Sequence, residues 1–210
     1  MARVRNDEQY ELRRARILSE AAKVFRQKGY NSATMEDLAT ALGVTKAAVY
    51  YYYPKKNDIL LEICEQALDR ALDRIRQNDS SRPAAERLRQ MVSDHVEIMT
   101  ENLEEFAVFF QELDLRRDPR ARRVITRQKE FAARVEELVQ AGIDAGEFRQ
   151  DADAALVTMA ILGMCNWLYR WFRTSGRSPD EIVTEFDNLL VHGLLAGPGP
   201  GPAGNGKAKR

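Results

Sequence analysis

The chain of 210 residues is 44% hydrophobic and 30% charged, a composition typical of an ordinary soluble protein that can bury a substantial core. Its 32 Lys and Arg equal its 32 Asp and Glu, so any affinity for nucleic acid has to come from the distribution of charge rather than from its total. Residues 1–60 contain 11 Lys and Arg against 7 Asp and Glu. The N-terminal part therefore has the modest excess of positive charge that binding to phosphate requires.

The chain lacks the sequence signals of several other protein classes. Cys64 and Cys165 lie far apart and fit no metal or redox spacing, which favours buried free thiols in a reducing cytoplasm. The charged N-terminus indicates no signal peptide, and the longest uncharged run, residues 154–169, is shorter than the ~20 residues of a membrane span. His95 and His192 have no catalytic partner at a suitable spacing. We therefore expect no enzyme, no metal site, no cofactor and no membrane partner.

In chain order, residues 1–9 are charged and lack periodicity, which predicts a flexible N-terminal arm. Arg3 and Arg5 in this arm either follow a DNA minor groove or are merely solvated. A first helix is expected over about residues 10–28, where Gly29 ends it and one face is apolar. The apolar face consists of Ile17, Ala21, Val24 and Phe25.

The stretch from Thr34 to Lys56 reads TMEDLATALGVTKAAVYYYYPKK and has the pattern of a helix-turn-helix. Thr34 and Thr45 can each cap a short helix, and Gly43 between them suits a left-handed turn. Apolar residues at helical spacing hold the two helices together, namely Leu38, Ala39, Leu42 and Val49, with Val44 filling the corner. With the first helix, this unit forms an expected DNA-binding domain over residues 10–55.

The second of these short helices exposes the residues that we expect to contact DNA. Its first turn is small and polar, so it can enter a major groove about 12 Å wide, and the tyrosines that follow offer rings to thymine methyls and sugars. Lys56 lies at the start of the next helix, where a lysine and free N–H groups can bind phosphate. The alternative is an aromatic core patch, but consecutive positions cannot all face inward, and only Tyr53 is expected to be buried. The predicted DNA contacts are Thr34, Thr45, Lys46, Ala47, Tyr50, Tyr51, Tyr52 and Lys56.

The segment from Arg14 to Glu62 resembles the N-terminal domain of TetR-family (TetR/AcrR) bacterial transcriptional regulators. The resemblance is carried, without a gap, by ILSEAAKVFRQKGYNSATMEDLATALGVTKAAVYYYYPKKNDILLEI. The family usually has His-Phe where this chain has Tyr52-Tyr53, and often Ser or Thr at Lys55, so no operator preference is carried over. The resemblance implies a homodimer that binds near-palindromic double-stranded DNA. Because most members of the family are repressors, it also implies that this chain represses transcription.

Beyond this unit the periodicity predicts only helices, so the chain is expected to be all-α. A helix over about residues 56–77 is long enough to link the DNA-binding domain to a second domain over residues 56–196. Further helices are expected at about residues 82–102, 105–115, 119–146, 152–173 and 179–194, with capping signals at Asp118-Pro119, at Asp151 or Asp153, and at Ser178-Pro179. From Gly197 the chain alternates Gly and Pro, which predicts a disordered tail over residues 197–210.

The second domain is expected to bind a ligand and to dimerise. Methionine and aromatic side chains line adaptable apolar pockets and also fill ordinary cores, and both alternatives stay open. Asn166 and Arg170 share a helix face, where Arg170 either binds an anionic ligand or pairs with a surface carboxylate. The expected ligand-binding residues are His95, Met99, Phe106, Phe109, Phe110, Met159, Met164, Asn166, Trp167 and Arg170. The apolar circumference of residues 152–173 and the amphipathic C-terminal helix predict a four-helix interface between two copies.

The tail of the predicted helix over residues 152–173, NWLYRWFRTSG, resembles TetR-family members that respond to fatty-acyl or other acyl-CoA thioesters. We therefore expect a repressor that a small hydrophobic, fatty-acid or acyl-CoA effector releases from its operator, through a population shift that moves the linking helix. The alternative is a helical protein-interaction module without sequence-specific DNA binding. The clustering of Lys46, three tyrosines and Lys56 on one exposed edge argues against that alternative.

Overall fold

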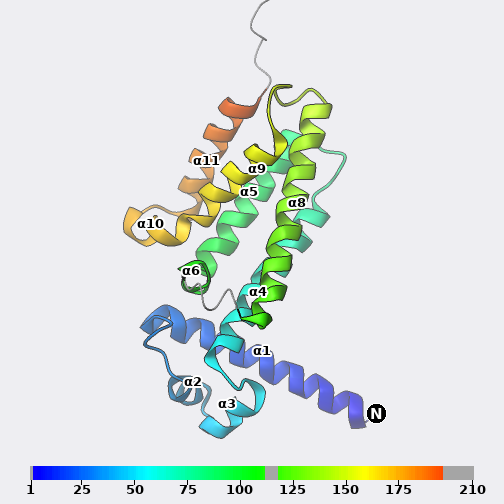
Figure 1. Ribbon diagram of the computed structural model, residues 1–210. Helices are drawn as coiled ribbons and strands as arrows, with labels where there is room; N and C mark the ends of the chain where they lie inside the picture. Colours follow the sequence, from blue (N-terminus) through cyan, green and yellow to red (C-terminus); the bar gives the residue numbers. More distant parts are fainter. Residues whose placement is uncertain (1, 112–117, 196–210) are drawn as a thin grey trace, which may run out of the picture.

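The computed structural model describes residues 2–111 and 118–195, and over these residues the chain is all-α, as predicted, with one isolated bridge between Phe148 and Leu195. The helices form a head, residues 2–55, and a body, residues 56–195 (Figure 1). The elements are α1 (Ala2–Lys28), α2 (Met35–Leu42), α3 (Lys46–Tyr52), α4 (Lys56–Gln77), α5 (Ala84–Glu101), α6 (Leu103–Gln111), the 3₁₀ turn η1 (Pro119–Ala121), α8 (Arg122–Asp144), α9 (Ala154–Asn166), α10 (Leu168–Ser175) and α11 (Pro179–Leu194).

The head is organised around α1, which begins at Ala2 rather than near Tyr10. Residues 2–9 were expected to form a flexible arm, and the structure places them in the helix instead. They contain no Gly or Pro, and Ala, Arg, Glu and Gln have high helix propensity, so they can extend a helix that packing has already nucleated. Farther along, buried Ile17 and Phe25 anchor α1 in the core, as its apolar face predicts.

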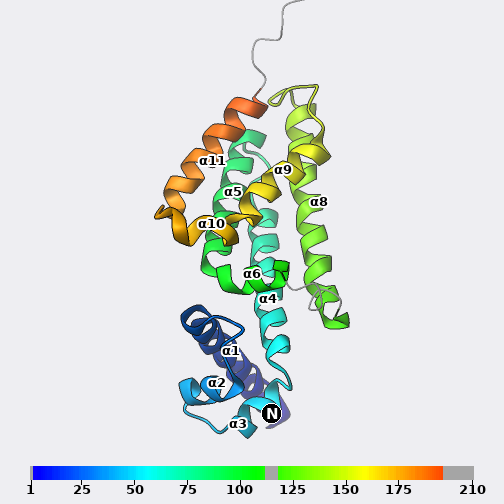
Figure 2. The ribbon, with the colours of Figure 1, turned by 60° about the vertical axis from the view of Figure 1, so that its left-hand side comes forward.

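The linking helix α4, at the start of the body, contacts both parts of the molecule (Figures 1 and 2). It contacts α1 on the head side, and it contacts α5 and α8 within the body. The short helix α6 contacts α1, α4 and α10, so it lies where the head meets the body. A displacement of α6 or α4 within the body would therefore move α1 and the head.

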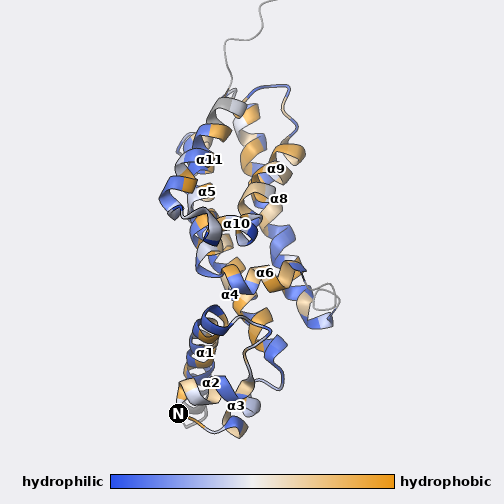
Figure 3. Ribbon diagram, turned by 90° about the vertical axis from the view of Figure 1, so that its left-hand side faces the viewer, coloured by the Kyte–Doolittle hydropathy of each residue, from blue (hydrophilic) through white to orange (hydrophobic). Residues whose placement is uncertain are grey.

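The body packs α5, α8, α9 and α11 side by side, and α9 is mostly hydrophobic (Figure 3). The helix predicted over residues 152–173 is divided at Trp167 into α9 and α10. At the division Leu168 is completely buried and Trp167 is 55% exposed. Residues 166–168 contain no Gly or Pro, so we attribute the division to tertiary packing.

Local signals set several boundaries in the body. Asp118 accepts a hydrogen bond from the Arg120 N–H at the start of η1, and Asp153 accepts one from the Leu156 N–H at the start of α9. Ser178 and Glu181 form the reciprocal cap of α11. These caps are confirmed, whereas the predicted end of the 105–115 helix and the predicted tail over residues 197–210 lie outside the described residues.

Candidate DNA interface and effector core

Two caps fix the start of α2 and of α3. The Thr34 hydroxyl accepts a hydrogen bond from the Asp37 N–H at 3.1 Å, and the Asp37 carboxylate accepts one from the Thr34 N–H at 3.0 Å. Lys28 also donates to Asp37, and these hydrogen bonds lower the pKa of Asp37 to about 2. The Thr45 hydroxyl accepts from the Ala48 N–H at 3.2 Å. Both predicted caps are confirmed, and they set where α3 begins.

The turn between the helices depends on Gly43, whose φ of +67° is the left-handed conformation that glycine adopts without strain. Leu38 and Val49 are fully buried and hold α2 against α3, as their spacing predicts. Val44 was expected to fill the corner, but it is 45% exposed, because its N–H caps α2 at the Ala39 carbonyl and its side chain is left outside the core.

The outer face of α3 carries most of the predicted DNA contacts. Thr45, Lys46 and Ala47 in its first turn are exposed, and Tyr51 near its end is 73% exposed. Lys46 forms an ion pair of 3.5 Å with Glu36 of α2, which a phosphate could replace. The structure thus brings these side chains onto one accessible surface, together with Tyr50, which is also exposed.

The last tyrosines differ in their surroundings. Tyr53 is buried, as predicted, and its hydroxyl accepts a hydrogen bond from Arg14 Nε at 3.3 Å. Burial raises the pKa of Tyr53 to about 12, so its hydroxyl is neutral at pH 7. Tyr52 is half-buried and contacts α1 through Tyr10 and Arg13.

Lys56 lies at the start of α4 but does not face the outer surface of α3. Its ammonium donates to the carbonyls of Tyr30 at 2.6 Å and Ala33 at 2.7 Å, and it lies 4.3 Å from the centroid of the Tyr30 ring. This geometry differs from the prediction that Lys56 binds phosphate. The side chain instead ties the loop between α1 and α2 to α4.

In the body, His95 of α5 and Asn166 of α9 form a polar pair within apolar surroundings. The distance between His95 Nε2 and Asn166 Oδ1 is 3.0 Å, and the His95 ring is stacked on Phe131 with centroids 5.0 Å apart. Burial lowers the pKa of His95, although the hydrogen bond to Asn166 opposes the shift, so the imidazole is neutral at pH 7. Its other nitrogen, Nδ1, is buried and has no hydrogen-bond partner among the residues that the structure describes.

The other predicted ligand-binding residues are distributed over three environments. Met99, Phe106 and Phe109 are buried in the core. Phe110 is half-buried and stacks on Tyr169 with centroids 5.6 Å apart, and Met164 is also half-buried. Met159, Trp167 and Arg170 are exposed, so they do not line the interior with His95. Asn166 and Arg170 were expected on one helix, but Asn166 is half-buried at the end of α9 and Arg170 is exposed on α10, because the predicted helix is divided at Trp167.

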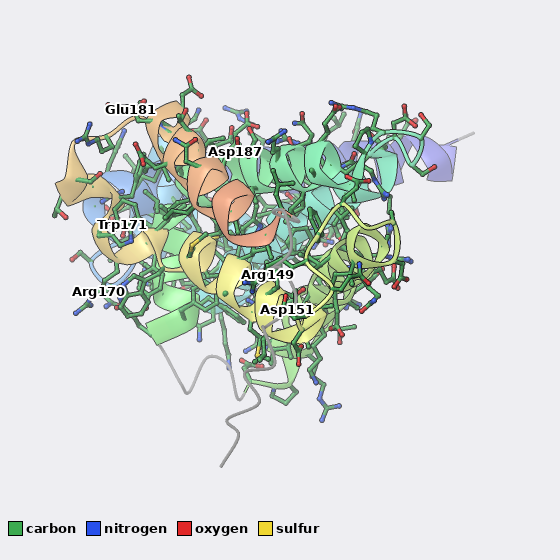
Figure 4. The ribbon with its side chains drawn as sticks, turned by 90° about the horizontal axis from the view of Figure 1, so that it is seen from above. Arg149, Asp151, Arg170, Trp171, Glu181 and Asp187 are labelled. Atoms are coloured by element: carbon green, nitrogen blue, oxygen red, sulfur yellow. The ribbon has the colours of Figure 1, made fainter. Side chains whose placement is uncertain are left out.

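Four large apolar side chains of α9 and α11 are exposed, and we call them the apolar stripe: Leu156 and Met159 of α9, Trp167 at its C-terminal end, and Leu189 of α11. Each of these is more than half exposed. Charged residues lie on the same and adjoining segments, and Figure 4 labels Arg170 on α10, Glu181 and Asp187 on α11, and Arg149 and Asp151 before α9. An apolar stripe bordered by charges is typical of a protein–protein interface.

The sequence did not reveal Glu105 of α6, which is fully buried and whose carboxylate oxygens have no hydrogen-bond partner within the described parts of the chain. Burial raises the pKa of Glu105 to about 7. Its neighbour Cys64 on α4 is also buried. Glu105 does not interrupt the helical pattern of the sequence, so its burial becomes evident only from the packing of α6 against the head.

A polar contact outside α4 connects head and body: Arg26 of α1 donates to the Glu101 carbonyl at 2.9 Å. Within the body, Arg120 of η1 forms an ion pair with Asp58 in the first turn of α4, next to the head. A cleft of 790 Å³ lies between α1, α4 and the end of α5. Among the described residues, no cluster of His, Cys, Asp and Glu is suited to a metal ion, and no helix is both long and apolar enough to cross a bilayer.

Comparison with known proteins matches both parts of the chain. Residues 17–63 match the model of bacterial regulatory proteins of the tetR family, and residues 81–194 match the model of the tetracyclin repressor-like C-terminal domain. The HTH-type transcriptional repressor KstR2 of Mycobacterium tuberculosis is 26% identical over 185 residues, which cover 87% of this chain and 92% of that protein.

Solved structures give the same result for the fold. PfmR, a TetR family transcriptional regulator from Thermus thermophilus, superimposes with a TM-score of 0.76 at 32% identity and covers 86% of this chain and 100% of its own. AibR, in complex with isovaleryl coenzyme A and operator DNA, superimposes with a TM-score of 0.70 at 24% identity, over 85% of this chain and 98% of its own.

Proposed function

Because the chain belongs to the tetR family of bacterial regulatory proteins, and so is a DNA-binding transcriptional regulator rather than an enzyme, we propose that it is a cytoplasmic repressor that a small hydrophobic or acyl-CoA effector releases from its operator. The observation that carries the proposal is the combination of an exposed α3 in the head with the polar pair of buried His95 and half-buried Asn166 in the body. The two sites are joined by α4 and α6.

The geometry of α3 supports binding in the major groove. Its first turn offers Thr45, Lys46 and Ala47, which are small or flexible enough to approach base edges and phosphates. Tyr50 and Tyr51 follow on the same exposed surface, where their rings can contact sugars and thymine methyls and their hydroxyls can donate to phosphate. We assign α3 as the helix that reads the operator.

The apolar stripe on α9 and α11 supports a homodimer. Leu156, Met159 and Trp167 would be buried when two copies pack these helices against each other across a two-fold axis. Two heads related in this way would read two half-sites about 34–36 Å apart or somewhat more. The operator is therefore expected to be a near-palindrome.

The His95–Asn166 pair supports a ligand that supplies a hydrogen-bond donor. With the Asn166 oxygen facing the ring, His95 Nε2 donates to it, and Nδ1 is left as an acceptor without a partner among the described residues. A buried acceptor without a partner is costly, and a hydroxyl or amide N–H of an effector would satisfy it. The aromatic rings of Phe110 on α6 and Phe131 on α8 suit an apolar portion of the same effector.

An acyl-CoA thioester combines these features, because its pantetheine arm has amide N–H groups and its acyl chain is apolar. The complex of AibR with isovaleryl coenzyme A shows that a protein of this fold can bind such a molecule. Arg170 is exposed on α10 and forms no ion pair with a described residue, so it can attract the phosphates of a bound coenzyme A.

Release from DNA would be a population shift. An effector that binds between α5, α8 and α9 displaces the helices packed against them, and the displacement reaches α1 through α6 and α4. The Arg120–Asp58 pair and the Arg26–Glu101 contact would have to yield during the change. A differential binding energy of about 1–3 kcal/mol is typical of such coupling and lowers operator affinity about 5- to 150-fold.

The test is a titration of free coenzyme A and acyl-CoAs of increasing chain length into a fluorescent operator complex, followed by anisotropy. Release by a limited range of chain lengths is the expected result. The variant His95→Ala should bind DNA normally and require at least about tenfold more effector, because it loses the acceptor. Arg134→Ala, at an exposed position of α8, serves as the control and should respond like the unmodified protein. No release at any chain length would exclude this effector class.

A further inference from the structure

The N-terminal half of α1 lies against the far end of α3 (Figure 1). Three tyrosine rings form the contact. The Tyr10 centroid is 5.0 Å from that of Tyr52 and 6.4 Å from that of Tyr51, and Tyr51 and Tyr52 are 5.0 Å apart with nearly perpendicular rings. Edge-to-face and tilted pairs at these separations attract each other, so the cluster fixes the orientation of the last turn of α3.

This support matters because α3 is short. It has seven residues, fewer than an isolated helix needs to persist, and Val49 is its one fully buried side chain. Its first turn is fixed by the Thr45 cap, and its last turn by the contacts with α1. Tyr51 remains 73% exposed within the cluster, so its position is set while its surface stays accessible.

Arg13 extends the same contact toward solvent. Its Nη1 donates to the Tyr52 hydroxyl at 3.4 Å, and the side chain is exposed. Arg13 has no ion pair with any side chain that the structure describes, whereas its neighbour Arg14 is paired with Glu62 at 2.5 Å. Arg13 is therefore a cation held beside the end of α3 by a hydroxyl group and not neutralised by a described carboxylate.

We propose that Arg13 and the Tyr52 hydroxyl together bind one backbone phosphate of the operator, and that Tyr10 is the positioning residue that holds this pair in place. The inference rests on the proposed binding of α3 to the operator. The Tyr52 oxygen accepts from Arg13, so its own hydrogen is free to donate to a phosphate oxygen, and the guanidinium keeps its remaining N–H groups for the same anion. The contact carries no sequence information and adds to affinity for any duplex.

The first test measures operator affinity at several salt concentrations. A dimer would place two copies of Arg13 on the DNA, so Arg13→Ala should reduce the slope of log affinity against log salt by about two. The control is Lys23→Ala, which removes one positive charge from an exposed position of α1 where Lys23 is paired with Glu20, and which should leave the slope unchanged. Arg13→Lys keeps the charge and should restore the slope but not all of the affinity.

The second test concerns Tyr10. Tyr10→Ala should weaken binding about three- to tenfold, and Tyr10→Phe should not, because the rings carry the contact. The double variant of Tyr10 and Arg13 should lose less than the sum of the single losses, since both act through Tyr52. Thermal melts of each variant exclude unfolding as the cause.

An unchanged salt slope in Arg13→Ala, with the unmodified protein binding normally, would overturn this inference alone. Absence of salt-dependent DNA binding by the unmodified protein would contradict the proposed function and this inference with it. The two failures are therefore distinguishable in one series of titrations.

Discussion

Replacing Lys56 with methionine tests whether this residue positions the head or binds DNA. The substitution removes the ammonium and keeps an unbranched side chain. The loop between α1 and α2 then loses two short hydrogen bonds, to the carbonyls of Tyr30 and Ala33, and a cation–π contact. Ala33 is buried, so its carbonyl would have to find a water molecule or remain without a partner.

The expected loss of stability follows from these contacts. Hydrogen bonds to charged groups contribute about 1.5–3 kcal/mol each, which gives about 3–6 kcal/mol for two fully buried ones. Lys56 is half-buried and its desolvation lowers its pKa, so part of that gain is offset. We expect a loss of about 2 kcal/mol, which corresponds to a decrease in Tm of about 4–8 °C for a chain of this size.

Two measurements decide between the roles. Thermal unfolding by circular dichroism should show the decrease in Tm for Lys56→Met and a smaller decrease for Lys56→Arg, which keeps the charge. Operator binding should weaken for all sequences with an unchanged salt slope, since no phosphate contact is lost. A normal Tm together with a slope reduced by about two would refute the positioning role and restore the phosphate contact predicted from sequence.

Three further predictions concern the body. Burial raises the pKa of Glu105 to about 7 from 4.5, so between these two pH values the folded protein keeps a proton that the unfolded chain releases. The free energy of unfolding should therefore fall by about 3 kcal/mol as the pH rises through this interval. Urea unfolding at pH 5 and pH 8 should show the decrease, and Glu105→Gln should remove it. Trp167→Glu places a charge in the apolar stripe and should convert a dimer into a monomer in sedimentation analysis, with operator affinity reduced at least tenfold; a dimer of normal affinity would contradict the interface. Gly142→Ala should lower stability by about 1–3 kcal/mol in urea unfolding, because a Cβ there would overlap the Phe148 ring, and an unchanged midpoint would show that the ring can move.

Local chemistry made much of the head predictable from sequence. The Thr34 and Thr45 caps, the left-handed Gly43 and the buried Val49 each follow from signals within a few residues, and the structure has all of them. The capping box at Ser178 and the linking helix over residues 56–77 were predictable for the same reason.

Features that depend on distant parts of the chain were not predictable. The division at Trp167 contains no Gly or Pro, and it coincides with the burial of Leu168 in the body beside the exposed Trp167. The direction of Lys56 depends on where the loop after α1 ends, and the burial of Glu105 depends on the junction between head and body. In the body, the sequence could select His95 and Asn166 as candidate ligand-binding residues, but only the fold shows that they meet and that Met159 and Trp167 are exposed.

The most direct test of the central claim is the selection of duplexes from a randomised library by the purified, unmodified chain. If two heads read DNA through α3, the recovered duplexes should share an inverted repeat with half-sites about one helical turn or somewhat more apart. Their binding should weaken steeply with salt. Recovery of duplexes without a shared repeat, or of isolated half-sites bound by a single subunit, would contradict the account.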